Sequence, residues 1–249
     1  MRYFIEIAYN GTSYFGWQMQ PDAISVQEEL EKALSTLLRK DLKVIGAGRT
    51  DTGVHARQLY AHFDFDTIED ASELTFRLNS FLPKDISVRN ILAVREDAHA
   101  RFHATERSYE YIISTQKDPF SEGLAHQLHR RPNVALMNEA ANELLSHQNF
   151  QCFSRSNTDV KTYNCKVTKA IWEENGNRLS FTITSDRFLR NMVRAVVGTL
   201  LDVGFGKTTF VDFLEILKSK DRTKAGASAP AHGLYLMEVG YPKDIFIVK

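Results

Sequence analysis

The chain has 249 residues, of which 43% are hydrophobic and 25% are charged, a composition typical of a soluble globular protein with one large domain or two. Its 31 basic and 31 acidic residues cancel, so the net charge argues neither for nor against a nucleic-acid partner. No apolar run approaches the ~20 residues of a membrane-spanning helix, and Glu6 interrupts the N-terminal apolar run where a signal peptide would continue.

The cysteines indicate the compartment. Cys152 and Cys165 are too few for a disulfide framework and lack the spacing of metal ligands. We therefore expect a cytoplasmic protein with reduced thiols. The sequence also lacks cofactor motifs and membrane-spanning runs, so we expect no bound metal, no cofactor and no membrane contact.

The first elements are a strand and a helix. An apolar strand is predicted over residues 4–9, with turn residues at 10–13 after it. Ser25 and Glu28 have the spacing of a capping box, and apolar residues follow at helical spacing as far as Leu38. These patterns predict an amphipathic helix with one core-facing stripe.

Three aromatic residues surround Gly16 between these two elements, namely Tyr14, Phe15 and Trp17. Two interpretations are open. The rings form a hydrophobic patch that covers the sheet, or they line an RNA-facing loop, because aromatic side chains stack on bases without sequence preference.

Residues 46–56 form a glycine-rich polar loop after an apolar run at 42–45, which predicts a short strand. Its three glycines permit backbone angles that other residues avoid. The residue order is neither that of a phosphate-binding P-loop nor that of a dinucleotide fingerprint. Asp51 is therefore either the reactive carboxylate of the protein or a turn residue that caps a backbone N–H.

Strands over 59–65 and 86–94 and a helix over 71–81 complete the first half. This order predicts a mixed α/β sheet with helices on one side. His55 in the loop and His62 in the next strand are expected to be structural.

We expect a second α/β half after a boundary near residues 100–106, which divides the chain into domains 1–103 and 104–249. Its elements are predicted as a strand around 109–113, a helix over 135–146, a hairpin of 166–174 with 178–185, helices over 188–203 and 208–218, and a strand over 233–239.

Two arginines mark the helix predicted over 188–203. Arg190 and Arg194 are four residues apart, so they share one face of such a helix. Arginines on an otherwise apolar helix need partners, and an ionised aspartate is a natural one, whereas a solvent-exposed face is the alternative. With Arg187 and the charged run 218–224, they are candidates for a basic surface that contacts RNA.

The loop sequence Gly48-Arg49-Thr50-Asp51-x-Gly53-Val54-His55-Ala56 resembles the signature of the TruA-type tRNA pseudouridine synthases. Other segments resemble further motifs of that family in the same order: Tyr9-x-Gly11-Thr12-x-x-x-Gly16-Trp17-Gln18, Ala100-Arg101-Phe102-x-Ala104, Arg107-x-Tyr109-x-Tyr111, Met192-Val193-Arg194, and residues 229–236. The departures are local: Asn10, Thr52, Gln58-Leu59 and His103.

The resemblance implies the pseudouridine synthase fold, of class α/β (α+β), with two similar halves, mixed or antiparallel sheets, and an active-site cleft between the halves. It also implies a homodimer that converts uridines 38, 39 and 40 of the tRNA anticodon stem-loop without a cofactor.

The same resemblance assigns roles to residues. Asp51 is the catalytic carboxylate, Tyr109 stacks on the target uracil, and Arg194 is the partner of Asp51, although Arg190 and Arg194 could exchange roles. The expected substrate contacts are Arg49, Thr50, Leu234, Arg190, Tyr14 and Trp17.

Two other classes of function remain open. An inactive tRNA-binding or tRNA-folding protein of the same fold is the first, but binding alone would not require Asp51, Arg194 and Tyr109 together. An Asp-dependent hydrolase of glycosidic bonds is the second. Retaining glycosidases need a second carboxylate about 5 Å away, and the sequence offers no partner for Asp51 at short spacing.

Overall fold

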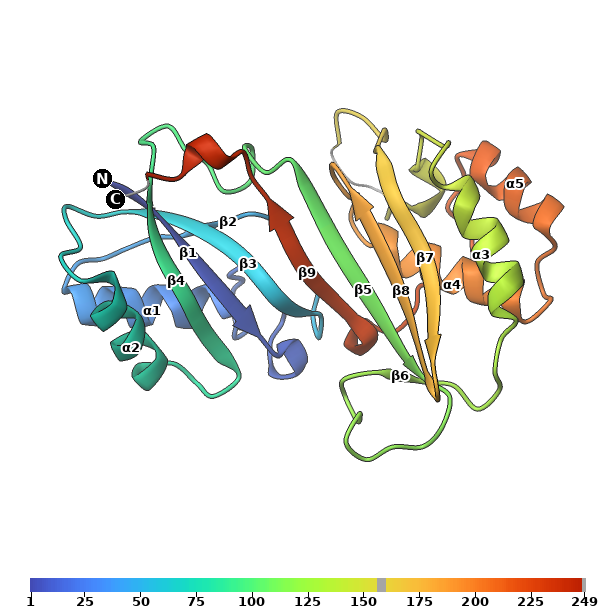
Figure 1. Ribbon diagram of the computed structural model, residues 1–249, viewed down its shortest axis with the longest axis horizontal. Coiled ribbons are helices and arrows are strands. Elements are labelled where there is room, and N and C mark those ends of the chain that lie inside the picture. The colour runs from blue at the N-terminus through green and yellow to red at the C-terminus, as the bar shows by residue number, and fades with distance from the viewer. Residues whose placement is uncertain (156–159, 248–249) are drawn as a thin grey trace. The chain divides into compact units, whose positions relative to one another are not determined.

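A computed structural model describes residues 1–155 and 160–247 of the chain. The chain forms two compact units (Figure 1). Unit 1 contains residues 1–105 together with 235–249, and unit 2 contains residues 106–234. Each unit combines strands with helices, which is the α/β class that the sequence predicts.

Unit 1 is built on a sheet with the strand order β4-β1-β3-β9. The strands are β1 (Arg2–Tyr9), β3 (His55–Asp64), β4 (Ile86–Val94) and β9 (Leu234–Gly240). The first three pair antiparallel, whereas β9 runs parallel to β3. A two-residue strand, β2 (Ile45–Gly46), pairs with β3 and leads into the loop that carries Asp51.

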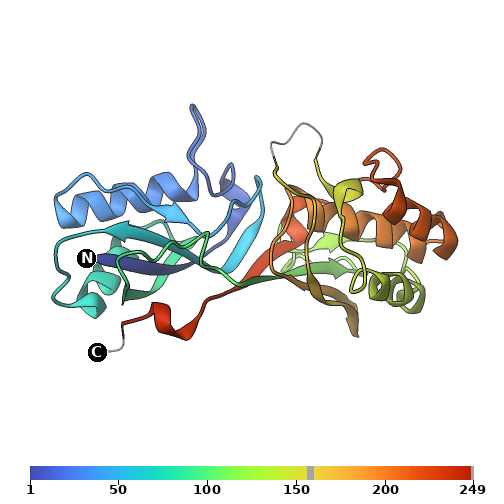
Figure 2. The ribbon, with the colours of Figure 1, turned by 90° about the horizontal axis from the view of Figure 1, so that it is seen from above.

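Helices α1 (Val26–Leu38) and α2 (Ala71–Phe81) contact each other beside this sheet. Leu30 and Leu34 of α1 are fully buried. Figure 2 shows α1 on one side of the sheet and the C-terminal segment on the other. On that second side, Phe4 of β1 packs against Tyr241 and Phe246, with ring centroids 5.1 and 6.1 Å away.

Unit 2 has an antiparallel sheet of strand order β5-β8-β7. Its strands are β5 (Glu106–Ser114), β7 (Val167–Asn175) and β8 (Arg178–Ser185), and the short β6 (His126–Gln127) runs parallel to β5. The helices are α3 (Val134–Glu143), α4 (Met192–Gly204) and α5 (Phe210–Ser219). Helix α3 packs against β7 and contacts both other helices (Figure 1). Short 3₁₀ turns complete the chain: η1 (Gly11–Ser13), η2 (Gln151–Phe153), η3 (Ala231–Gly233) and η4 (Lys243–Ile245).

The run at 42–45 is not the strand that we expected, apart from Ile45. Leu42 and Val44 are buried, but side chains of α1 accept their backbone N–H groups. Ser35 Oγ accepts from Leu42 at 3.0 Å, and Glu31 Oε1 accepts from Val44 at 3.0 Å. A partner strand is therefore unnecessary for these residues.

The division of the chain differs from the expected 1–103 and 104–249 at its C-terminal end. Residues 235–249 belong to unit 1, because β9 pairs with β3 and the segment after it bonds to the end of β4. The backbone N–H of Ile247 donates to the carbonyl of Ala93 at 2.9 Å, and that of Arg95 donates to Ile245 at 3.1 Å.

Candidate active site

The Asp51 loop leaves the sheet immediately after β2. The backbone N–H of Ala47 still donates to the Tyr60 carbonyl of β3, at 2.7 Å, and the chain then departs from the sheet. It returns through a tight turn in which the N–H of Val54 donates to the carbonyl of Asp51 at 3.1 Å. Gly53 in that turn has a φ of 76°, which explains the glycine at this position.

The segment after β1 braces this loop from the main chain. The N–H of Trp17 donates to the carbonyl of Thr50, and the N–H of Gly53 donates to the carbonyl of Tyr14, each at 3.3 Å. Gly16 lies so close that a Cβ there would be 2.3 Å from the Thr50 carbonyl oxygen. The first motif of the sequence and the Asp51 loop are therefore packed backbone against backbone.

Side chains complete the brace. The hydroxyl groups of Tyr9 and Thr50 share a hydrogen bond of 2.8 Å, and Thr50 is buried. His55 Nδ1 accepts the N–H of Gly11 at 3.0 Å, while its ring stacks on Tyr235 at 4.5 Å. His55 is 1% exposed, which agrees with the structural role expected for it.

Asp51 and Arg49 are the charged residues of the braced loop that solvent reaches. Asp51 is partly exposed, and Arg49 is exposed. The Arg49 Nε–H group donates to Gln18 Oε1 at 3.1 Å, so the guanidinium is tied to the bracing segment. This arrangement holds a carboxylate and a guanidinium on a rigid support, with access to solvent.

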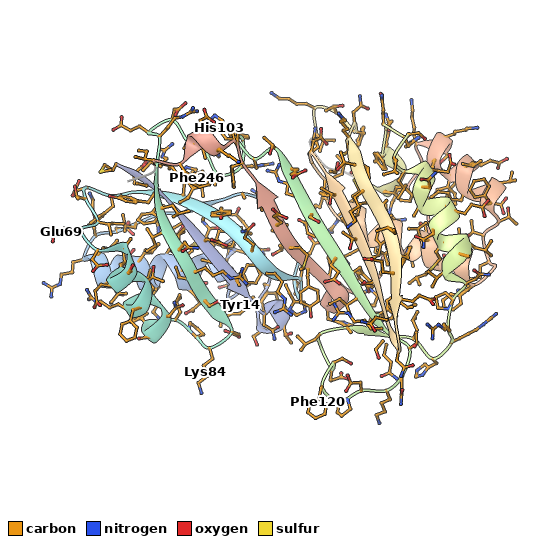
Figure 3. The ribbon with its side chains drawn as sticks, in the orientation of Figure 1. Tyr14, Glu69, Lys84, His103, Phe120 and Phe246 are labelled. Carbon is orange, nitrogen blue, oxygen red and sulfur yellow. The ribbon has the colours of Figure 1, made fainter. Side chains whose placement is uncertain are left out.

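Of the three aromatic residues near Gly16, only Phe15 is exposed, to 54%. Trp17 is 2% exposed, and its indole lies under Gly46, where a Cβ would be 2.5 Å from Nε1. Tyr14, labelled in Figure 3, is 4% exposed and donates to Asp85 Oδ1 at 2.6 Å. Burial and this hydrogen bond raise the pKa of Tyr14. Tyr14 and Trp17 thus follow the first interpretation, a patch packed on the sheet, rather than rings open to bases.

Tyr109 and Tyr111 of β5 differ in their surroundings. Tyr111 is fully buried, and its hydroxyl donates to the carbonyl of Pro230 at 2.9 Å. Tyr109 is partly exposed and meets the ring of Phe188 edge-on, with centroids 5.1 Å apart. Tyr109 is therefore the more exposed member of the pair.

Arg194 lies in the first turns of α4 and is tied to the segment that precedes β9. Its Nε–H donates to the carbonyl of Ala229 at 2.7 Å, and its own carbonyl accepts the N–H of Ala229 at 2.9 Å. These two hydrogen bonds to main chain hold Arg194 in one direction.

Leu234, at the start of β9, is buried and 6% exposed.

Arg190 does not share a helix face with Arg194, contrary to the expectation. Helix α4 begins at Met192, and Asn191 before it has a left-handed backbone with a φ of 65°. This break puts Arg190 in the preceding turn, where it is exposed and its carbonyl accepts the N–H of Arg155.

The candidates thus fall into two groups. Arg49, Thr50 and Asp51 are together on the loop of unit 1, whereas Tyr109, Arg190, Arg194 and Leu234 belong to unit 2. Sequence reasoning gave Gln18 no role, although the first family motif ends on this residue and it bonds to Arg49.

Residues 1–155 and 160–247 contain no group of three or more metal-binding side chains, and none of their helices is long and apolar enough to cross a bilayer. Cys152 and Cys165 are free and buried, and burial raises the pKa of each thiol to about 12. A thiol with so high a pKa is a poor nucleophile at neutral pH.

Comparison with known proteins gives a consistent result. A family model described as tRNA pseudouridine synthase matches residues 6–103 and 140–242. The tRNA pseudouridine synthase A of Porphyromonas gingivalis is 52% identical, over 99% of this chain and 99% of its own length. That of Bacteroides fragilis is 52% identical over 98% of both chains, and that of Bacillus subtilis is 40% identical over 97% of this chain and 99% of its own.

Proposed function

This chain belongs to the tRNA pseudouridine synthase family, and from that premise we propose that it converts uridines 38, 39 and 40 of the tRNA anticodon stem-loop to pseudouridine. Similarity to tRNA pseudouridine synthases A over almost the whole chain is the observation that carries the proposal. The assignment to the anticodon stem-loop rests on the motif resemblance alone.

The reaction is an isomerisation and balances without a co-reactant. The bond between N1 and C1′ breaks, the uracil turns, and a bond forms between C5 and C1′. The proton on C5 leaves to solvent, and N1 takes up a proton. No redox equivalent or phosphate donor is consumed, so the proposed activity requires no cofactor.

In our proposal Asp51 is the reacting carboxylate. It attacks C1′, attacks the uracil ring, or removes the C2′ proton, and each route needs the ionised form. Burial against a base would raise the pKa of a carboxyl group, and a guanidinium opposes that rise. We propose that Arg194 supplies this guanidinium. Support for Asp51 comes from its partly exposed position on a braced loop.

The other candidates would bind the nucleotide. A paired uridine must leave its stack, at a cost of roughly a few kcal/mol. We propose that Tyr109 stacks on the everted uracil, Leu234 packs beside it, and Arg49 and Arg190 contact neighbouring phosphates. Thr50 takes part indirectly, because it is buried and holds the loop through Tyr9.

We also propose that two copies of the chain act as a homodimer and that the enzyme works in the cytoplasm. The motif resemblance supports both statements. Sedimentation of the protein with and without tRNA tests whether it is a homodimer.

The test is release of tritium from tRNA that carries C5-labelled uridine. Wild-type protein should release tritium, and replacement of uridines 38, 39 and 40 by cytidine should abolish the release. Asp51→Asn should lower the rate by at least about 10³-fold, because it removes the reacting group. Asp66→Asn is the matched control, since the Asp66 side chain is 87% exposed on the surface.

Each alternative gives a different result. A protein that only binds tRNA releases no tritium although it retains affinity. A hydrolase releases free uracil and leaves an abasic ribose. Undiminished release by Asp51→Asn would overturn the role proposed for that carboxylate.

A further inference from the structure

Three side chains connect α1 to the arginine of the Asp51 loop. Glu31 Oε1 accepts from Gln27 Nε2 at 2.9 Å, and Gln27 Oε1 accepts from Gln18 Nε2 at 2.9 Å. Gln18 Oε1 then accepts from Arg49 Nε at 3.1 Å. We call Gln18, Gln27 and Glu31 the relay. It joins a helix of the core to a side chain two positions from Asp51.

The relay is anchored at its inner end. Glu31 is 3% exposed, and its carboxylate also accepts the backbone N–H of Val44 at 3.0 Å and the Lys43 ammonium at 3.2 Å. Gln27 has further bonds to main chain, because its Nε2 donates to the Val44 carbonyl and its Oε1 accepts the N–H of Met19. Glu31 and Gln27 are therefore held in place by hydrogen bonds that do not involve the side chain of Gln18.

The chemistry of the two ends determines the direction of every bond between them. A carboxylate only accepts, so Gln27 must turn its amide nitrogen toward Glu31 and its oxygen toward Gln18. Gln18 must then present its own nitrogen to Gln27, which leaves its oxygen for the next partner. A guanidinium only donates, and Arg49 is that partner. An inverted amide at either glutamine would place two donors or two acceptors against each other.

We propose that Gln18 is a positioning residue for Arg49, and that Gln27 and Glu31 hold Gln18 in the required orientation. A long exposed arginine otherwise loses rotamer freedom when it binds a ligand, and a prior hydrogen bond reduces that cost. The bond uses Nε–H, so it orients the guanidinium without occupying either terminal nitrogen. The part of the inference that concerns catalysis rests on the proposed function, in which Arg49 contacts a tRNA phosphate.

The first test uses the free protein and needs no RNA. In arginine-labelled protein, NMR measures how fast the Arg49 Nε–H exchanges with solvent. Gln18→Met keeps the volume of the side chain but removes the acceptor, and Gln27→Met removes the link behind it. Both should accelerate the exchange about fivefold or more. Gln20→Met is the matched control, because Gln20 lies on the same segment and its side-chain Nε2 donates to the main-chain carbonyls of Phe15 and Gln18.

Unchanged exchange in Gln18→Met would overturn the proposal, and so would equal acceleration in Gln20→Met. Gln27→Met also removes a partner of the buried Glu31; if it fails to fold, Gln18→Met decides alone, since it leaves the bond between Gln27 and Glu31 in place.

The second test asks whether the effect of Gln18 on enzymatic activity depends on Arg49. Tritium release under kcat/KM conditions is compared for Gln18→Met in the wild-type and Arg49→Ala backgrounds. Gln18→Met should lower kcat/KM about fivefold in the first and have no further effect in the second, because its effect passes through Arg49. Equal losses in both backgrounds would show a merely structural role and overturn the inference. A wild-type protein without tritium release would refute the proposed function, while the exchange measurement would still decide the relay.

Discussion

Two residues of the same type on one strand face can differ in burial, as Tyr109 and Tyr111 show. Strand periodicity puts both tyrosines on one face of β5 but does not say which of them is buried. The structure buries Tyr111 completely and ties its hydroxyl to the carbonyl of Pro230. The neighbouring Ala229 holds Arg194, so Tyr111 supports the segment that orients the arginine.

Tyr111→Phe should therefore destabilise the protein by about 1 kcal/mol, because the fully buried tyrosine loses the hydrogen bond that its hydroxyl donates to the partly exposed Pro230 carbonyl. Urea unfolding measures the loss. Tyr163→Phe, at a half-exposed tyrosine of the same unit, should change the free energy of unfolding by less than about 0.5 kcal/mol. A Tyr111→Phe protein as stable as the wild type would contradict this account of the buried hydroxyl.

At the scale of the elements, helix α4 has a main-chain segment packed directly against it. The segment 226–229 crosses it, with the N–H of Gly226 bonded to Thr199 Oγ1 at 2.9 Å and Ala229 bonded to Arg194 in both directions. Gly198 permits this approach, because a Cβ there would be 1.7 Å from the carbonyl oxygen of Ala227. The position of Arg194 thus depends on a glycine inside a helix.

Gly198→Ala should destabilise the protein by about 2–3 kcal/mol, although alanine in a helix interior is normally favoured over glycine by about 1 kcal/mol. The clash with main chain reverses the usual sign, since backbone cannot move aside as a flexible side chain does. Thermal and urea unfolding measure the change. Gly48→Ala is the control, because a Cβ at Gly48 meets nothing within 4 Å and should cost little. A stabilised Gly198→Ala protein would show that the crossing segment gives way.

The same elements show how far the sequence determines the fold. Helices α1 and α2 have the predicted bounds, because their caps, Ser25 and Asp70, are local signals and accept N–H groups of the first turn. Helix α4 begins later than predicted, since the apolar spacing continues through Asn191 but the left-handed backbone there interrupts the helix. Apolar periodicity identifies buried faces and does not detect such a break.

At the scale of the whole molecule, contacts between distant segments escaped prediction. The glycine-rich loop could be recognised, but the bracing of Thr50 by Trp17 and of His55 by Gly11 depends on how the chain folds back. For the same reason the sequence could not show that Trp17 is buried, because its indole packs under Gly46, which is distant in the sequence. Composition could not show that residues 235–249 return to unit 1, because pairing across such a distance leaves no local pattern.

Because residues 235–247 pack on unit 1, a substitution in this segment should destabilise unit 1 rather than unit 2. Phe246, labelled in Figure 3, contacts the rings of Phe4, Tyr60 and Tyr241, which all belong to unit 1. Phe246→Ala should cost about 2 kcal/mol, less than a fully buried phenylalanine, because this ring is only partly covered.

Amide hydrogen exchange locates the loss that Phe246→Ala causes. Amides of β1, β3 and β4 should lose about thirtyfold protection, as a change of about 2 kcal/mol requires, whereas those of β7 and β8 should retain theirs. Ile247→Ala is the matched control, since Ile247 is 47% exposed and adjacent in sequence. Loss of protection in β7 and β8 with β1 unaffected would instead support a division of the chain at residue 104, because the C-terminal segment would then stabilise the second half.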